Sequence, residues 1–146
     1  MDNEDVVAEA RRWLGTPYVH QASCRGAGAD CLGLLRGVWR GIYGREPEAV
    51  PAYTPDWSET DRIERLLPAA ARHMRSVNWA ERLPGDALVF RMRHRGVAKH
   101  VGILTETVPS LAFIHAYSGR GVVESPLSSA WARRVAGLFR FPDRSD

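Results

Sequence analysis

The chain has 146 residues, of which 45% are hydrophobic and 25% are charged, and its formal net charge is +3 at pH 7. This length and this ordinary composition predict a single globular domain over residues 1–146 with a substantial core. The mild charge, with no clustered basic stripe, excludes nucleic acid as an expected partner. No segment is long and apolar enough for us to expect membrane insertion.

The two cysteines, Cys24 and Cys31, are too few for a disulfide framework, although a bond between them would close a short loop. Their spacing lacks the close ligand pairs of structural zinc sites, and we expect neither a metal nor another cofactor. The acidic residues 1–5 do not resemble a secretory signal peptide, which starts with positive charge. We therefore expect synthesis in the cytoplasm, with another component delivering the protein if its substrate lies outside.

Helices are predicted in the first half of the chain. Residues 3–14 have an apolar face and end at Gly15, with Asn3 as a suitable N-cap. After a loop, apolar residues at helical spacing predict a second helix over residues 31–43, stopped at Gly44.

Residues 45–83 are predicted to form an insertion between this second helix and the strands that follow. Residues 45–57 contain three prolines and should be irregular. Ser58 is a plausible cap for a further helix that runs through Ile63, and Pro68 either kinks this helix or opens a new turn.

The second half of the chain changes to the two-residue period of strands. Strands are predicted at residues 87–92, 100–105, 111–117, 122–125 and 135–141. Short strands joined by tight turns indicate an antiparallel sheet, here of about five strands. Helices followed by strands give an α+β domain.

Cys31 is predicted to lie in the first turn of the second helix. Unpaired N–H groups and the positive end of the helix dipole meet there, and both favour a nucleophilic thiolate. Gly33, Gly37 and Gly41 form a stripe that indicates another layer packed close to the helix backbone. Because a free cysteine is also a common apolar core residue, this stretch alone does not decide whether Cys31 is a nucleophile or a residue that fills the core.

Two of the five histidines fall on predicted strands, whereas His73 and His94 are expected to be solvated. If the two strands form a hairpin centred between residues 107 and 108, His100 lies directly opposite His115 on the same face. A slip of one residue would remove this pairing.

Cysteine hydrolases need a thiol, an imidazole that takes its proton, and a polar group that orients the imidazole. Cys31, His100 and His115 fit these three roles. The alternative is that the two histidines have no catalytic role and simply have their hydrogen bonds satisfied within a half-buried sheet.

Five segments together resemble the NlpC-type cell-wall peptidase family: Gly15–Tyr18, Asp30–Leu34, Pro84–Asp86, His100–Ile103 and Ile114–Ala116. The resemblance covers nearly the whole chain. It implies a papain-like α+β fold, with N-terminal helices packed on a C-terminal antiparallel sheet. It also implies a cysteine peptidase that cleaves amide bonds in peptidoglycan stem peptides.

The resemblance also implies roles for individual residues. It makes Cys31 the nucleophile, His100 the general base and His115 the orienting residue. Tyr18 matches an active-site tyrosine that lines the pocket beside the thiol. Asp30 matches an aspartate that helps to bind a free stem-peptide amine.

This sequence departs from the family pattern at two positions near the thiol. Leu32 stands where many relatives have a serine that acts with Asp30 on the amine, and His20 stands where relatives often have a tryptophan. We favour a role for Asp30 as a helix cap over recognition of the amine.

The insertion at residues 45–83 resembles that of small single-domain members linked to phage tails and gene transfer agents. It implies tail or baseplate partners, and action in the periplasm or cell wall as part of a virion-like particle. Two alternatives remain: a thiol amidase or acyltransferase on the same fold, and a structural tail-tip component with a vestigial site. In the second alternative, residues 91–95 and 45–57 would be docking surfaces.

Overall fold

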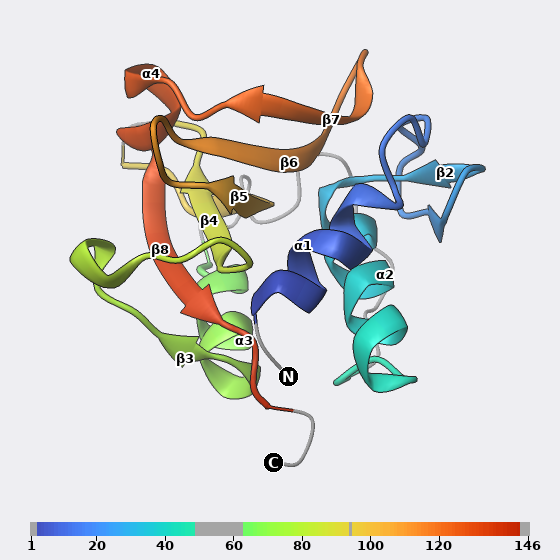
Figure 1. Cartoon of the computed structure of the whole chain (residues 1–146), viewed down its shortest axis with the longest axis horizontal. Coiled ribbons are helices and arrows are strands. Elements are labelled where there is room, and N and C mark those ends of the chain that lie inside the picture. Colours follow the sequence, from blue (N-terminus) through green and yellow to red (C-terminus); the bar gives the residue numbers. More distant parts are fainter. Residues whose placement is uncertain (1–2, 49–62, 94, 144–146) are drawn as a thin grey trace.

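The computed structural model describes residues 3–48, 63–93 and 95–143. Its helices are α1 (Asn3–Arg11), α2 (Cys31–Tyr43), α3 (Leu66–His73) and α4 (Ser129–Ala132), with a short 3-10 helix at Trp79–Glu81. Its strands are β1 (Ser23–Cys24), β2 (Gly28–Ala29), β3 (Arg75–Ser76), β4 (Ala87–Arg91), β5 (Ala98–Glu106), β6 (Ala112–Tyr117), β7 (Gly121–Pro126) and β8 (Val135–Arg140). Figure 1 shows α1 and α2 together on one side of a twisted sheet.

Six strands form the main sheet, in the order β3-β8-β4-β5-β6-β7, and all neighbouring pairs are antiparallel. The predicted α+β class and the five predicted strands are confirmed. The sixth strand, β3, was not predicted, because two exposed residues are too few to give an alternating pattern. The separate hairpin of β1 and β2 lies within the segment predicted as a loop.

Helix α2 has the predicted bounds because signals at both of its ends are local. The Asp30 carboxylate accepts the N–H of Gly33 at 2.7 Å and caps the first turn. At the other end, Gly44 adopts φ 81°, and its N–H bonds to the carbonyl oxygen of Arg40. The apolar side of α2 packs on β5 and β6.

Helix α1 ends three residues earlier than predicted. Residues 12–14 bond to carbonyls three residues back, which turns the chain out of the α-helix. This turn buries Trp13, which is 4% exposed, and leaves Leu14 41% exposed. The N–H of Gly15 then bonds to Val122 O and ties the turn to β7.

The glycine stripe of α2 faces α1 and the loop that follows it. A Cβ on Gly37 would lie 2.0 Å from the Trp13 ring, and a Cβ on Gly33 would lie 1.8 Å from the carbonyl oxygen of Ala22. The close layer indicated by the glycines is therefore the N-terminal segment of the chain.

Helix α3 begins at Leu66, with Pro68 in its first turn, where a missing N–H costs little. The predicted continuation of a helix through Ile63 is wrong, since residues 63–65 are not helical. Ser58 and most of the segment predicted to be irregular lie outside the described residues.

The sheet separates two apolar cores. The helix face, which α1 and α2 cover, includes Val101 and Ile103. The far face includes Leu88, Phe90 and Phe113. No helix in the described part of the chain is both long and apolar enough to span a membrane.

Candidate active site

His100 and His115 lie side by side on the far face of the sheet. Their rings are joined by a hydrogen bond of 2.9 Å between His100 Nε2 and His115 Nδ1. Both residues are buried, with 7% and 2% of their surfaces exposed. The structure thus brings together the two histidines that the sequence placed on neighbouring strands.

The register that joins them differs from the predicted one. Ile103 pairs with Ile114, which shifts β6 by two residues relative to a direct pairing of His100 with His115. Near the turn, Glu106 pairs with Ala112, so the hairpin is centred later in the chain than predicted, and an irregularity between Leu104 and Glu106 reduces the offset by one residue to the observed two. Because the shift is even, both histidines keep the same face.

Gly102 makes the diagonal contact between the histidines possible. Extending the observed register places Gly102 opposite His115, and a Cβ there would lie 3.3 Å from His115 Cβ and 2.9 Å from a ring carbon of Phe113. Without a side chain at this position, the His115 ring reaches the diagonal neighbour at His100. Helix α2 packs on the opposite face of β5, so the absence of a side chain at Gly102 serves the contact between the histidines and not the approach of α2.

An aromatic side chain that the sequence analysis did not select covers both histidines. The Trp131 ring lies 5.6 Å from that of His100 and 5.0 Å from that of His115, centroid to centroid. Tyr117, which is 37% exposed, lies 5.7 Å from the same indole. Trp131 sits on α4, a helix of four residues in a connection, so no periodic signal marked it.

Cys31 is the first residue of α2, as predicted, and its thiol meets the backbone of β5. Sγ lies 3.9 Å from the carbonyl oxygen of Lys99, in a long hydrogen bond. Among the described residues, no hydrogen bond joins Sγ directly to the ring of His100. The thiol is therefore next to the histidine along the strand, but its hydrogen bond goes to the main chain.

The thiol occupies an edge of β5 that β6 leaves open. The β5–β6 ladder begins at Ile103, and Leu104 directs its own backbone groups toward the chain that enters β4, at 2.7 and 2.9 Å. Backbone groups alternate along a strand, so those of Lys99 and Val101 point to the side where β6 would lie. Cys31 Sγ contacts this edge of β5 at the carbonyl oxygen of Lys99.

The thiol is protonated in this arrangement. Burial of the sulfur raises the pKa of Cys31 to about 12, and the carboxylate of Asp30 adds to this effect. Backbone groups at Val101 and at the start of α2 act in the opposite direction. The prediction that the helix terminus favours a thiolate is wrong for this state, because burial outweighs the N–H groups.

Both imidazoles are neutral near pH 7. Burial lowers the pKa of His100 to about 3, with further lowering by His115 and Lys99. Burial also lowers the pKa of His115 to about 4. The resting site is a neutral thiol beside two neutral rings.

Asp30 and Tyr18 both lie near the thiol of Cys31. Asp30 is 2% exposed and accepts the backbone N–H groups of Gly33 and Gln21, each at 2.7 Å, so the favoured role as a cap is confirmed. Tyr18 forms a parallel bridge with Ala29, and burial, followed by the nearby Cys31 and Asp30, raises its pKa to about 12. Binding of substrate by either residue stays a prediction.

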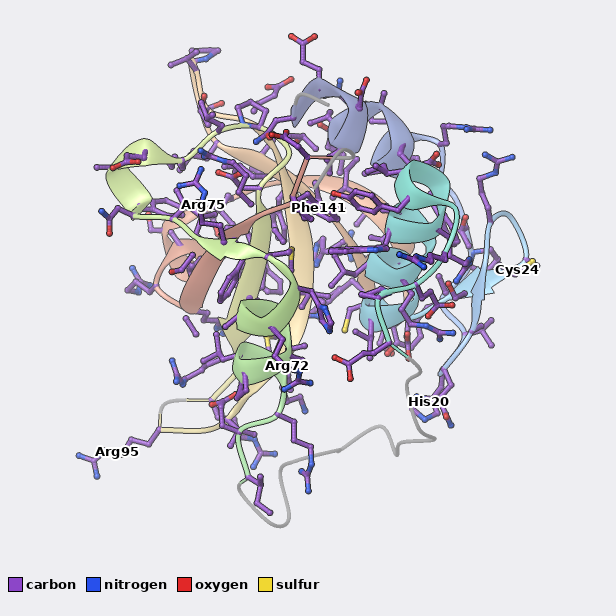
Figure 2. All side chains as sticks on the ribbon, turned by 90° about the horizontal axis from the view of Figure 1, so that it is seen from below. His20, Cys24, Arg72, Arg75, Arg95 and Phe141 are labelled. Atoms are coloured by element: carbon purple, nitrogen blue, oxygen red, sulfur yellow. The ribbon has the colours of Figure 1, made fainter. Side chains whose placement is uncertain are left out.

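The other cysteine and the other described histidines that the sequence analysis named lie away from His100 and His115. His20 Nδ1 is 3.8 Å from Asp30 Oδ2, and Figure 2 shows His20 and Cys24 at separate points on the surface. Both cysteines are free. His73, expected to be solvated, is half-buried and lies 2.7 Å from Glu48. His94 lies outside the described residues.

Solved structures match the chain over nearly its whole length. The NlpC/p60 domain of the peptidoglycan hydrolase SagA superposes with a TM-score of 0.64 at 22% identity, covering 97% of this chain and 100% of that one. An NlpC/P60 family protein from Bacillus cereus has a TM-score of 0.67 at 21% identity, covering 97% of this chain and 40% of that one. This chain has the NlpC/P60 fold.

The same NlpC/P60 fold occurs in an NLP/P60 family protein similar to lipoprotein from Staphylococcus aureus, with a TM-score of 0.63 at 23% identity over 98% of this chain and 43% of that one. No family model matches the sequence. The gamma-DL-glutamyl hydrolase of Bacillus subtilis is 28% identical over 139 residues, which cover 93% of this chain and 29% of that protein. The chain thus spans less than a third of the curated relative that it matches.

Within residues 3–48, 63–93 and 95–143, no group of three or more His, Cys, Asp or Glu side chains is placed to hold a metal ion.

Proposed function

We propose that this chain is a cysteine peptidase that hydrolyses amide bonds in peptidoglycan stem peptides. The observation that carries the proposal is the position of Cys31, at the start of α2 and against the β5 backbone beside His100, whose ring is hydrogen-bonded to His115. The NlpC/P60 fold is shared with a protein named peptidoglycan hydrolase, which supports this class of substrate.

In the first step, Cys31 Sγ forms a bond to the amide carbonyl carbon while its proton passes to Nδ1 of His100. Nδ1 is the ring nitrogen for this transfer because Nε2 is already hydrogen-bonded to His115. Sγ must first turn from Lys99 O toward the imidazole. Backbone N–H groups at the start of α2 then stabilise the developing oxyanion.

In the second step, the carbon–nitrogen bond breaks and His100 returns the proton to the leaving amine, which leaves a thioester on Cys31. A water molecule gives a proton to His100 and forms a bond to the thioester carbon. The carbon–sulfur bond then breaks and His100 returns the proton to Sγ, so the products are a carboxylic acid and the free thiol. His115 holds the ring of His100 throughout by accepting its Nε2–H.

The test compares digestion of purified peptidoglycan by the wild type, Cys31→Ala and Cys24→Ala, with products identified by mass spectrometry. Cys24 is a matched control because it is the other free cysteine and is exposed on β1. We expect new stem-peptide fragments from the wild type and Cys24→Ala, and none from Cys31→Ala. An active Cys31→Ala protein would refute the mechanism.

The bond that we propose is a γ-glutamyl amide. This choice is supported by the name of the curated relative, gamma-DL-glutamyl hydrolase. Masses of the released fragments identify the bond, since cleavage on either side of the glutamyl residue leaves different termini. An added amine that becomes joined to the acyl product would instead favour an acyltransferase.

The rival function is a structural component with a vestigial site. Two observations favour it: the thiol bonds to the main chain, and its pKa is raised to about 12. The rival predicts no fragments under any condition, together with alkylation of Cys31 that stays slow in the presence of peptidoglycan. Fragments that require Cys31 would exclude it.

We further propose that a phage-like tail carries this hydrolase to the periplasm or cell wall, where it acts. The resemblance of the insertion at residues 45–83 to that of tail-linked NlpC-type proteins supports this delivery. Mass spectrometry of purified particles from the producing cells tests it. Absence of the chain from particles that contain the other tail proteins would contradict the proposal.

A further inference from the structure

A cavity of about 500 Å³ lies beside the far-face core, between the end of β4 and the junction of α4 with β8. Five arginines line it: Arg91, Arg93, Arg95, Arg133 and Arg134. The two segments that supply them are joined by a backbone hydrogen bond of 2.8 Å from Arg91 N to Arg134 O. Figure 2 shows Arg95 at the outer end of the first segment.

The remaining lining residues of this arginine cavity are apolar. Met92, Ala130 and Val135 complete its lining, and both Met92 and Val135 pack against the far-face core. The volume is within the range of small-molecule sites. Guanidinium groups that line one cavity with apolar neighbours produce a stronger local field than the same groups spread over open surface.

Acidic side chains offset this charge only in part. The described lining of the arginine cavity contains no Asp or Glu. An acidic neighbour is Glu64, whose carboxylate lies 3.6 Å from Arg91 and also accepts the N–H of Ala98 at 3.0 Å. Four of the five arginines are exposed at the surface.

Composition alone does not explain the grouping. Nearly all positive charge in this chain is arginine, so scattered surface arginines are expected. Here, however, residues from two distant segments converge on one hollow. Arg134 is also held in place, because its guanidinium lies 5.5 Å from the centre of the Trp131 ring.

We propose that the arginine cavity is a binding site for a phosphate group. A single carboxylate is satisfied by one or two guanidinium forks, whereas a phosphate presents more oxygens and more charge to a ring of arginines. Trp131 connects the two sites, because the ring that carries Arg134 also contacts His100 and His115. A phosphate held by Arg134 would therefore be separated from the His100–His115 pair by the side chain of Trp131.

The experiment measures binding of tripolyphosphate to the full chain by isothermal titration calorimetry at two salt concentrations. The variant is Arg133→Ala/Arg134→Ala. The matched control is Arg25→Ala/Arg120→Ala, which removes the same charge at positions outside the cavity. The cavity variant loses two charge-assisted contacts to the phosphate, so we expect it to bind at least tenfold more weakly and the control less than twofold.

A second experiment, vesicle flotation, distinguishes a lipid headgroup from a soluble or polymer-borne phosphate. Flotation with phosphatidylglycerol vesicles, against phosphatidylcholine vesicles, that depends on Arg133 and Arg134 would assign a lipid headgroup. Binding of tripolyphosphate without flotation would assign a soluble or polymer-borne phosphate. Thermal melting of each variant checks folding, and Arg93→Ala/Arg95→Ala is a second cavity variant.

Three results would overturn the proposal. The first is no binding of tripolyphosphate at millimolar concentration, and the second is equally weakened binding in the cavity and control variants. The third is an oligonucleotide that binds more tightly than tripolyphosphate, with an affinity that neither cavity variant changes. Cys31→Ala should bind tripolyphosphate like the wild type. The phosphate site and the proposed hydrolysis can therefore fail independently.

Discussion

Replacing Gly33 by alanine tests how the start of α2 is held. The new Cβ would lie 1.8 Å from the carbonyl oxygen of Ala22 and 3.0 Å from Asp30 Oδ1. The first of these is a backbone atom, so a side-chain rotation cannot relieve the contact. The loop before α2 has to move away from the helix.

The expected cost follows from the contacts that this movement disturbs. Overpacking in a close-packed region costs about 1–3 kcal/mol. The hydrogen bond from Ser23 Oγ to Gly33 O at 2.6 Å, and that from Gln21 N to Asp30 at 2.7 Å, are each worth about 1 kcal/mol. Alanine recovers about 1 kcal/mol of helix propensity. We therefore expect a loss of about 2–3 kcal/mol, which lowers Tm by about 5–10 °C.

Gly41→Ala is the matched control on the same helix. Its Cβ would meet the end of the Glu9 side chain at 2.3 Å, and this side chain can rotate toward solvent. The free energy of unfolding should stay the same or rise by up to about 1 kcal/mol. Urea denaturation followed by circular dichroism measures both variants. Equal stability of Gly33→Ala and the wild type, or equal losses in the two variants, would refute this account of the helix.

Three further predictions concern charge and pH. Burial lowers the pKa of His100 and of His115, so the folded chain binds fewer protons than the unfolded chain below about pH 6.5. The free energy of unfolding is therefore highest above that pH. As the pH falls toward about 4, it decreases by about 1.4 kcal/mol per pH unit for each ring. Urea unfolding at pH 7 and 5 measures the loss, and a variant without both histidines should show a flatter profile. Iodoacetamide should alkylate Cys31 slowly at pH 7 and faster toward pH 10, with the other cysteine removed, because its pKa is raised; a flat rate would contradict the buried thiol. Asp86→Ala should cost about 3–5 kcal/mol in urea unfolding, because it leaves Arg140, now bonded at 2.8 and 2.9 Å, without its carboxylate; a loss under 1 kcal/mol would contradict a structural ion pair.

Local signals made some elements predictable. The bounds of α2 follow from a cap at Asp30 and a left-handed glycine at Gly44, which act within one turn of the helix. The strand types follow from alternation, which each strand carries in its own residues. The same logic placed Cys31 at the first turn and both histidines on one face.

Other features depend on contacts between distant segments, and the sequence could not supply them. The two-residue register shift arises because the β5–β6 turn is centred later than predicted, and an irregularity near Leu104 removes one residue of the offset; no residue pattern in either strand predicts these two features. Trp131 reaches the histidines only because α4 folds over the far face of the sheet. The thiol was predicted to ionise easily, but burial by the assembled core has the larger effect on the pKa of Cys31.

The part of β5 that β6 does not pair with links the stability of the sheet to the proposed hydrolysis. If the pairing of β6 with β5 continued past Ile103 to Val101, the sheet would gain further ladder hydrogen bonds, each worth about 1 kcal/mol. That same pairing would expel the sulfur of Cys31 from the place that it now contacts. Selection for a more stable sheet would therefore remove the position of the proposed nucleophile, and selection for the proposed hydrolysis would keep β6 away from this part of β5.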